Sequence, residues 1–441
     1  MKGCVISAAM TGAGKTTVTL GLLDALRNRG IPVQPFKVGP DFIDPGLHEI
    51  AAGVESHNLD GWMLTREANE RLFARAMIGR DVAIVEGVMG LFDGFDGKSE
   101  SGSTAEMARW LDLPVIIVID AHSMARSAAA IVHGMRSFDP RIKIAGVVFN
   151  RVAGDGHYRI LADAVTDTPI LGWLPADTSV EIPERHLGLF TAKEERTVAR
   201  IRAIGQFFEK HINLDAILDA LTEGENGDSE QFSYGNCSLS PFSPSIHKRV
   251  ALARDKAFSF YYHANRFELE QAGGQVIEFS PLTDPEVPEA DFLYIGGGYP
   301  ELYRKELEAN SSMRASVRRF IESGKRFYAE CGGLMYLARS IDGAKMVGVV
   351  PVDVQMTNRL VDFGYCELTT RHESVLGPVG TTARGHQFHY SRCVEPSGDA
   401  YIVNQDGRQY FEGFVFPNGL ASYVHLHFLS NPALAKNMLH S

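Results

Sequence analysis

The sequence predicts two doubly wound α/β domains joined by a linker. In the first half, short β-branched runs alternate with segments of helical spacing, which is typical of parallel strands connected by helices. Residues 223–246 then lack apolar periodicity and are rich in Gly, Ser, Asn and Pro, as linkers are. A second alternating series follows. We therefore predict domains at 1–222 and 247–441.

Each expected element follows from its local pattern. Buried parallel strands are short apolar runs bounded by turn residues, and the first half offers Gly3–Ala8, Val82–Glu86, Val115–Asp120 and Ile142–Asn150. Helical spacing predicts helices at Lys15–Arg29, Thr65–Ile78, Ser103–Leu111 and Arg126–Arg136. The second series offers strands at Arg249–Arg254, Gln275–Phe279, Phe292–Ile295 and Arg326–Ala329, and the strand-rich tail adds Phe414–Phe416 and Ser422–His425.

The composition excludes several classes of protein. A formal net charge of −11 argues against a nucleic-acid binder or a protein of anionic membrane surfaces. We find no apolar run of about 18 residues and expect no signal peptide. The five cysteines lack CxxC spacing, which fits a reducing compartment. We therefore expect a cytoplasmic protein with no membrane or nucleic-acid partner, and a homodimer is compatible with the sequence.

A phosphate-binding loop follows the first predicted strand. The segment Ser7–Thr17, SAAMTGAGKTT, fits the pattern GxxxxGK[ST] except that Ala9 replaces the first Gly. Lys15 would bridge the β- and γ-phosphates of ATP and Thr16 would bind Mg²⁺. Asn150 is a candidate adenine contact or a strand-end cap. The predicted ATP-binding residues of the loop are Thr11, Gly12, Ala13, Gly14, Lys15, Thr16 and Thr17. The competing explanation is a Gly-rich turn that only starts a helix.

Charged residues near this loop are candidates for metal binding and phosphoryl transfer. Glu86 ends a predicted strand, where a Mg²⁺ ligand is expected to leave a parallel sheet. Asp41 is a second metal candidate, and Lys37, Asp44 and Asp93 are candidates for substrate binding or phosphoryl transfer. We expect Asp41 and Asp44 in a loop rather than a helix, so turn formation is the competing explanation for both.

A second chemical site is predicted around Cys331, in YAECGGLMYL. A nucleophile between a strand and a helix projects its side chain from a tight turn, and a helix N-terminus is expected to lower the thiol pKa. Gly297, in IGGGYPEL, and Gly332 are candidate oxyanion-hole residues. The alternative is a buried structural cysteine.

Two histidines in SYVHLHF are candidate bases for Cys331. His425 and His427 are two residues apart on a predicted strand, so their side chains would share one face. Either could accept the thiol proton. Cysteine, glycine turn and histidine together favour a thiol acyl-transfer site.

Taken together, these motifs resemble the cobyrinate a,c-diamide synthase family of glutamine-dependent amidotransferases. The resemblance runs nearly end to end. It covers the phosphate loop, KVGPDFIDP, VEGVMGLFDG, PERHLGL, DKAFSFYY, IGGGYPEL, AECGGLMYL, GHQFHYS and SYVHLHF. It implies an N-terminal P-loop domain similar to dethiobiotin synthetase and a C-terminal domain similar to class I glutamine amidotransferases.

The resemblance also implies roles for individual residues. Cys331 would be the glutaminase nucleophile, and His425 the favoured base, because its spacing matches the Tyr-x-His of related cobyric acid synthases. The usual Glu two residues after the base is His427 here, so a full Cys-His-Glu triad is not expected. Gln387 stands where the family is expected to have Glu, in a segment expected to face the substrate.

The implied reaction is the ATP-, Mg²⁺- and L-glutamine-dependent amidation of the a and c acetates of cobyrinate, a polycarboxylate tetrapyrrole. It would proceed through an acyl phosphate and ammonia released from glutamine. Hydrogenobyrinate and nickel sirohydrochlorin are alternative substrates for the same chemistry. A partitioning-type ATPase switch with an inert cysteine domain is a different class, and it is disfavoured because Ala8, Ala9 and Met10 lack the extra loop Lys of those ATPases.

Overall fold

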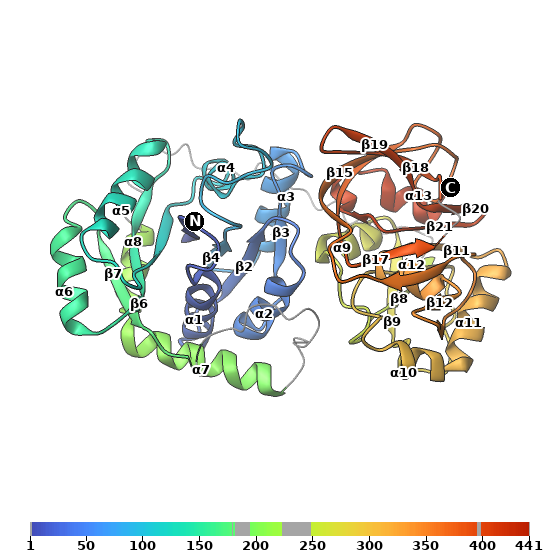
Figure 1. Ribbon diagram of the computed structural model, residues 1–441, viewed down its shortest axis with the longest axis horizontal. Helices are drawn as coiled ribbons and strands as arrows, with labels where there is room; N and C mark the ends of the chain where they lie inside the picture. The colour runs from blue at the N-terminus through green and yellow to red at the C-terminus, as the bar shows by residue number, and fades with distance from the viewer. Residues whose placement is uncertain (1, 179, 181–194, 223–247, 395–397, 441) are drawn as a thin grey trace. The chain divides into compact units, whose positions relative to one another are not determined.

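The computed structural model divides into two compact units, Met1–Cys237 and Ser238–Ser441 (Figure 1). The residues it describes are 2–178, 180, 195–222, 248–394 and 398–440. The predicted linker 223–246 and the PERHLGL motif at 183–189 lie outside the described residues. Each unit has a large sheet of its own.

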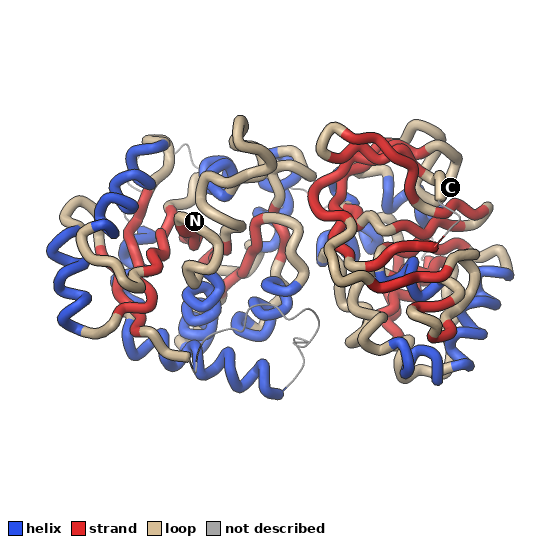
Figure 2. The backbone as a smooth tube through the Cα atoms, in the orientation of Figure 1, coloured by secondary structure: helices blue, strands red, loops and turns tan. Residues whose placement is uncertain are grey.

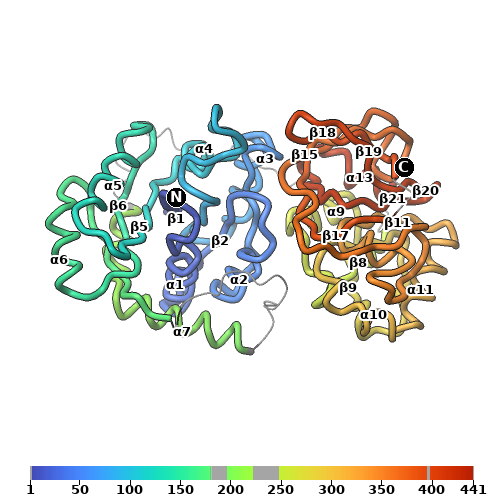
Figure 3. Tube along the Cα trace, in the orientation of Figure 1, coloured from blue at the N-terminus to red at the C-terminus, as the bar shows by residue number. Residues whose placement is uncertain are grey.

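The first unit is built on a parallel sheet of seven strands in the order β3-β2-β4-β1-β5-β6-β7. The strands are β1 (Lys2–Ala8), β2 (Val33–Val38), β3 (His57–Leu59), β4 (Val82–Glu86), β5 (Val115–Asp120), β6 (Ile144–Val152) and β7 (Ile170–Pro175). The first strand of the chain thus lies between β4 and β5, and Figure 3 labels β1 beside β5 in this unit. Ligands of open α/β sheets bind outside the carboxyl ends of strands where the strand order reverses, which is the end of β1 and β4.

Helices cover both faces of this sheet. They are α1 (Lys15–Asn28), α2 (Ile43–Ala52), α3 (Arg66–Ala76), α4 (Thr104–Trp110), α5 (Ser127–Phe138), α6 (Asp155–Ala164), α7 (Glu195–His211) and α8 (Leu214–Thr222). Val33 of β2 packs in the core that α1 and α7 share. Phe36, on the opposite face of the same strand, stacks on Phe73 of α3 with ring centroids 4.8 Å apart. The predicted doubly wound arrangement is therefore confirmed in this unit.

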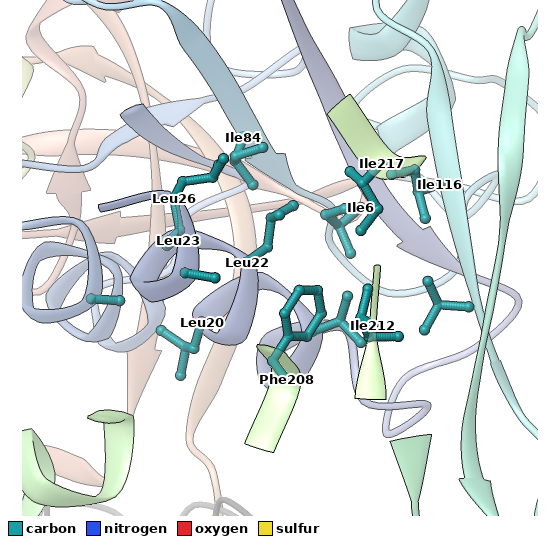
Figure 4. Packing of buried hydrophobic residues seen from close by; sticks show 14 of the residues in the cluster. Ile6, Leu20, Leu22, Leu23, Leu26, Ile84, Ile116, Phe208, Ile212 and Ile217 are labelled. Atoms are coloured by element: carbon teal, nitrogen blue, oxygen red, sulfur yellow. The ribbon is translucent and has the colours of Figure 1, made fainter. Parts of the chain in front are cut away.

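A hydrophobic core between α1 and the sheet fixes the helix that begins at the phosphate loop. Figure 4 shows Leu20, Leu22, Leu23 and Leu26 of α1 with Ile6, Ile84, Ile116, Phe208, Ile212 and Ile217. A Cβ on Gly21 would lie 2.6 Å from the Cβ of Phe208, so glycine lets α1 and α7 approach closely. Burying each large apolar side chain contributes roughly 1.5–3 kcal/mol. The helix that starts at the loop is thereby fixed against the sheet.

Two elements near the site differ from the sequence prediction. β2 was not predicted, because Pro35 and two polar residues interrupt its apolar pattern. Asp44 was expected in a loop, but it lies in the first turn of α2. Pro45 follows it there, at a position where its missing N–H costs no helical hydrogen bond. An Asp-Pro pair therefore occurs both in turns of loops and in the first turn of a helix, so the pair alone does not distinguish the two.

The second unit contains a six-stranded sheet and two smaller sheets, and Figure 2 shows its strands in red and its helices in blue. The large sheet has the order β20-β21-β11-β10-β8-β9, and only its edge strand β20 is antiparallel to its neighbour. Its strands are β8 (Lys248–Ala253), β9 (Gly274–Phe279), β10 (Phe292–Ile295), β11 (Arg326–Glu330), β20 (Phe414–Phe416) and β21 (Gly419–Ser422). The two-domain α/β prediction is confirmed.

The remaining elements of the second unit frame the large sheet. Its helices are α9 (His263–Gln271), α10 (Arg304–Ala309), α11 (Ser311–Glu322), α12 (Gly332–Leu337) and α13 (Leu434–His440). One small sheet contains β12 (Ser340–Ile341), β13 (Ala344–Lys345), β14 (Asp353–Met356) and β17 (Ser391–Val394). The other contains β15 (Asp362–Thr370), β16 (Thr382–His389), β18 (Tyr401–Gln405), β19 (Arg408–Glu412) and β22 (His425–Leu426).

Candidate active sites

The phosphate loop in the first unit is held by glycines and by Asn150. Gly12 has φ +80° and Gly14 has φ +101°, a conformation that side chains with a Cβ rarely adopt. A Cβ on Gly14 would also lie 2.1 Å from Nδ2 of Asn150, and that Nδ2 donates to the carbonyl of Ala13 at 3.0 Å. Asn150 therefore supports the loop, and its contact with adenine stays a prediction.

Lys15 lies at the first position of α1 and is buried. Its Nζ donates to the carbonyl of Met89 at 2.6 Å and to that of Met10 at 3.2 Å. Burial, followed by the nearby Lys37, lowers the pKa of the Lys15 ammonium. These carbonyls are weak partners that a phosphate oxygen could replace, because charge-assisted hydrogen bonds to an anion are stronger.

Glu86 is the centre of a buried polar network at the end of β4. Its Oε1 accepts hydrogen bonds from Thr16 Oγ1 at 2.7 Å and Lys37 Nζ at 2.9 Å, and its Oε2 lies 2.7 Å from His48 Nε2. Burial alone would raise the pKa of this carboxyl, but Lys37 and His48 hold it well below its ordinary value. The carboxylate is therefore ionised at neutral pH.

Lys37 joins Glu86 to the first turn of α2. Its Nζ lies 2.6 Å from Asp44 Oδ2, and both side chains are buried. Burial would lower the pKa of Lys37, yet Asp44 and Glu86 raise it above its ordinary value. A buried ammonium between two carboxylates stays charged for this reason. Of our phosphoryl-transfer candidates, Lys37 and Asp44 thus contact the Glu86 network directly.

Asp41 and Asp93 accept hydrogen bonds from backbone N–H groups. Asp41 Oδ1 accepts from the N–H of Ile43 at 2.8 Å and of Asp44 at 3.1 Å, and Asp93 Oδ2 accepts from the N–H of Gly90 at 2.9 Å. These contacts fit a turn-forming role, and the metal or phosphoryl-transfer roles of Asp41 and Asp93 stay predictions. Within the described residues, no group of three or more His, Cys, Asp or Glu is arranged to hold a metal.

Sequence reasoning missed His48 in this site. It is fully buried, contacts Glu86, and its Nδ1 lies 3.2 Å from Ser56 Oγ. The only local signal is its spacing, because Asp44 and His48 are four residues apart and share a face of α2. That signal has meaning only if the segment is helical.

In the second unit, Cys331 occupies the tight turn between β11 and α12. Its φ of 52° and ψ of −105° are rare for a residue with a side chain, and such strain is common at nucleophilic turns. Its N–H donates to the carbonyl of Ser422 at 2.7 Å, which ties the turn to the end of β21. Cys331 is 5% exposed.

The thiol pKa differs from the sequence expectation. We expected the helix N-terminus to lower it, but burial, followed by Glu301 and Glu330, raises the pKa of Cys331 far above its ordinary value. The six-residue helix α12 offers little dipole against this burial. The resting side chain is therefore a thiol, and a base must accept its proton.

Two glycine turns lie close to this cysteine and to His425. A Cβ on Gly332 would lie 3.1 Å from the backbone N of Gly298, and a Cβ on Gly297 would lie 2.3 Å from Cε1 of His425. Both positions are crowded against backbone or ring atoms, which explains why the sequence has glycine there. The candidate oxyanion residues, the cysteine turn and His425 thus converge at the carboxyl ends of β10, β11 and β21.

The two histidines do not share one strand, contrary to the prediction for Ser422–His425 and the residues after it. The chain leaves the large sheet at Ser422 and enters the other sheet at His425, because Tyr423 and Val424 pair with neither. His427 follows β22 and caps a short 3₁₀ helix, with its Nδ1 accepting from the N–H of Leu429 at 3.3 Å. The two rings therefore have different surroundings.

The surroundings of each ring indicate different tasks. The His425 ring lies against Gly297, and burial, with His386 and His389, lowers its pKa well below the ordinary value. A neutral imidazole can accept a proton. The His427 ring packs on Tyr262 with centroids 4.6 Å apart.

Two buried carboxyls hold the backbone of the segment 422–426. Glu412 accepts from Ser422 Oγ at 2.6 Å and from the N–H of Tyr423 at 2.8 Å. Glu330 accepts from the N–H of Leu426 at 3.1 Å and from Tyr328 at 3.2 Å, and Tyr294 also donates to it. Burial raises the pKa of each carboxyl to about 7. Sequence reasoning missed both: Glu330 stands next to Cys331 in the AECGG motif but was given no role, and Glu412 lies outside every quoted motif.

Gln387, the departure in GHQFHYS, is also buried. Its Nε2 donates to the hydroxyl of Tyr410 at 3.0 Å, and its Oε1 lies 3.3 Å from Nε2 of His389. The Gln387 side chain points into the unit, and the expectation that this segment faces the substrate stays a prediction. A neutral amide there avoids burying a charge without a cation.

Comparisons with known proteins agree with this arrangement. Residues 4–190 match the CobQ/CobB/MinD/ParA nucleotide binding domain, and residues 249–433 match the CobB/CobQ-like glutamine amidotransferase domain. The chain therefore combines a nucleotide-binding domain with a glutamine amidotransferase domain. No helix among the described residues is long and apolar enough to cross a membrane.

Relatives that match over nearly the whole chain narrow the class further. Proteins named cobyrinate a,c-diamide synthase are 42% identical in Listeria innocua, over 99% of this chain and 99% of the relative, and 41% identical in Dehalococcoides mccartyi, over 99% and 97%. The relative from Methanothermobacter thermautotrophicus is 39% identical over 98% of both chains. The chain belongs to the cobyrinate a,c-diamide synthase family.

Proposed function

We propose that this protein uses ATP and glutamine to amidate the a and c acetate carboxylates of cobyrinate. The observation that carries the proposal is the presence in one chain of a phosphate loop beside Glu86 and a cysteine turn beside His425. The full-length similarity to proteins named for this substrate supports the choice of tetrapyrrole. The two sites divide the chemistry between activation of a carboxylate and release of ammonia.

At the first site, a substrate carboxylate attacks the γ-phosphate of ATP, which forms an acyl phosphate and releases ADP as the bond between the β- and γ-phosphates breaks. Amides of the loop 11–17 bind phosphate oxygens at the start of α1, and Lys15 exchanges its carbonyl partners for the β- and γ-phosphates. Lys37, which lies between Asp44 and Glu86, is proposed to stabilise the charge of the transferring phosphoryl group. Phosphate is then a good leaving group when ammonia attacks the carbonyl.

Mg²⁺ fits the oxygen donors that lie beside the loop. Thr16 Oγ1 and the Glu86 carboxylate are within hydrogen-bond distance of each other, and hydroxyl, carboxylate and phosphate oxygens are the ligands Mg²⁺ prefers. Thr16 and Glu86 would hold the ion, with Asp41 as the predicted further ligand. When bound, Mg²⁺ neutralises charge on the β- and γ-phosphates.

At the second site, Cys331 attacks the side-chain amide of glutamine. His425 accepts the thiol proton as the C–S bond forms and donates it to the departing ammonia. Backbone amides at Gly297 and Gly332 are proposed to stabilise the oxyanion. Water then hydrolyses the γ-glutamyl thioester to glutamate.

Incubation with defined substrates tests the proposal. The protein is given ATP, Mg²⁺ and ¹⁵N-amide glutamine with cobyrinate, hydrogenobyrinate or nickel sirohydrochlorin, and products are read by mass spectrometry. We expect two ¹⁵N amides on cobyrinate at the highest kcat/KM. A higher kcat/KM for either other tetrapyrrole would replace cobyrinate as the substrate. Glutamine hydrolysis without amidation of any of the three would overturn the proposal.

A further inference from the structure

His386 of β16 and His425 of β22 face each other across paired strands of the second unit. They are directly opposed in the antiparallel pairing of β16 with β22. Their rings are stacked, with centroids 5.0 Å apart and an interplanar angle of 15°. Both side chains are buried. One flat face of the candidate base is therefore covered by a second imidazole.

The glycine before His386 makes this approach feasible. A Cβ on Gly385 would lie only 2.1 Å from the carbonyl oxygen of His425 and 3.0 Å from its carbonyl carbon. Any side chain at 385 would push β22 away from β16 and separate the rings. The first two residues of the GHQFHYS motif thus bring β22 close and cover the His425 ring.

Tyr262 fixes the His386 ring from a third element. Its hydroxyl lies 3.0 Å from Nδ1 of His386, and both groups are buried. Tyr262 belongs to the DKAFSFYY motif and precedes α9, so the contact links two motifs to which the proposed reaction gives no task. A buried hydrogen bond of this kind restricts rotation of the imidazole.

The edge of the same His425 ring faces the glycine turn at Gly297. A Cβ at this glycine would meet Cε1 of the ring before any other atom. The ring is thus confined by backbone at its edge and by His386 on its face. In amidotransferases with a full triad a carboxylate orients the histidine, whereas His427 occupies that sequence position here and its Nδ1 accepts from Leu429.

We propose that His386, held by Tyr262, is the positioning residue for His425 in glutamine hydrolysis. The inference rests on the proposed role of His425 as the base. Stacking sets the plane of the His425 ring, and the Tyr262 hydroxyl sets the plane of His386. His386 acts through His425 and touches neither glutamine nor the thioester. Misplacing a catalytic group by about 1 Å can cost about 10²-fold in rate.

The test measures glutamate release and the KM for glutamine in the full chain. We expect His386→Ala to lower kcat about 10–100-fold, as loss of an orienting partner does, with KM nearly unchanged. His386→Phe keeps a flat ring in the stack and should recover most of the lost kcat. Tyr262→Phe removes only the hydroxyl and should cost about 3–10-fold, the worth of one hydrogen bond.

Phe388→Ala is the matched control for damage to β16. Phe388 lies two residues after His386, on the same face of the strand, is exposed, and packs against the rings of Phe363 and Tyr390. We expect its kcat to match that of the unsubstituted chain. A loss in Phe388→Ala equal to that in His386→Ala would make the effect one of strand stability and overturn the proposal.

A double substitution separates positioning from general disruption. If His386 acts only through His425, adding His386→Ala to His425→Ala should cost little more than His425→Ala alone. A full additional loss would overturn the proposal, as would normal kcat in His386→Ala beside a large loss in His425→Ala. Normal kcat in His425→Ala would instead refute the base assignment in the proposed function and this inference with it.

Discussion

Glu86 in the first unit and Glu330 in the second are equally buried carboxyls with opposite pKa shifts. Glu86 contacts Lys37 and His48, and its pKa lies well below the ordinary value. Glu330 contacts two tyrosine hydroxyls and the N–H of Leu426, and burial raises its pKa to about 7. A cation offsets the loss of water around a carboxylate, whereas neutral donors offset only part of it.

The difference matches the chemistry proposed for each unit. Phosphoryl transfer needs fixed charges beside the phosphates, and the network around Glu86 keeps those charges at neutral pH. Thiol acyl transfer needs a proton to move between Cys331 and His425. Near that pair, burial raises the pKa of the Glu330 and Glu412 carboxyls to about 7, and no buried Lys–carboxylate pair like that of Lys37 with Glu86 is present among the contacts described for this site.

Cys331→Ser is expected to have the largest effect, and it tests whether glutamine hydrolysis and carboxylate amidation occur at separate sites in the two units. Removing a nucleophile that acts with its base typically costs about 10⁴-fold or more in rate, so glutamine-dependent amidation should disappear. Amidation with free ammonium should remain near the original rate, because the first unit needs no thiolate. The measurement is amide product by mass with each nitrogen source. Loss of both activities in a folded protein would contradict two separate sites.

The two histidines offer the next largest effect. General-base assistance is worth about 10²–10⁴-fold, so His425→Ala should lower glutamate release by about that factor. His427→Ala should cost much less, since its Nδ1 caps the 3₁₀ helix and its ring packs on Tyr262. Steady-state glutaminase assays compare the two variants. The reverse ranking would make His427 the base.

Glu86→Gln tests the charged site. The substitution keeps the shape of the side chain and removes the charge that Lys37, His48 and the metal need, so ammonium-dependent amidation should fall about 10²–10³-fold. Glutamate release should continue. Asp93→Asn is a suitable control, because Asn retains an oxygen for the Gly90 N–H, and we expect a smaller loss. An equal loss would place Asp93 in phosphoryl transfer, and near-normal turnover of Glu86→Gln would remove Glu86 from the site.

The smallest predicted effect concerns the pH dependence of stability in the second unit. The folded pKa of Glu330, about 7, exceeds the ordinary 4.5, so the folded state binds more protons between these values. Its contribution to the free energy of unfolding is therefore full below pH 4.5 and is lost as pH rises to about 7, by up to about 3 kcal/mol.

Glu330→Gln should flatten this dependence. Its amide oxygen can accept from Leu426 and Tyr328, while its NH₂ donates to the hydroxyl of Tyr294. Hydrogen exchange of the β11 amides at about pH 5 and about pH 8 measures the opening free energy in both proteins. An unchanged pH dependence in the variant would show that Glu330 does not titrate in this range.

The local sequence pattern was sufficient to predict much of the fold. The strands β4 and β5 begin and end where apolar runs predicted, and the phosphate loop and the cysteine turn were both recognisable from short motifs. The two-domain division followed from composition. The local sequence pattern did not predict β2, because Pro35 interrupts its apolar run. It did not predict the start of α2, because Pro45 suggested a loop.

By itself, the sequence determined which residues carry reactive groups, because motifs such as GAGKTT and AECGG bring their own local geometry. Only the tertiary structure decided which other residues contact these reactive groups and their partners. His48 reaches Glu86, and His386 reaches His425, across about 38 residues of chain in each case. Such contacts depend on sheet order and strand register, which are set by the burial of the whole core and not by any neighbouring residues.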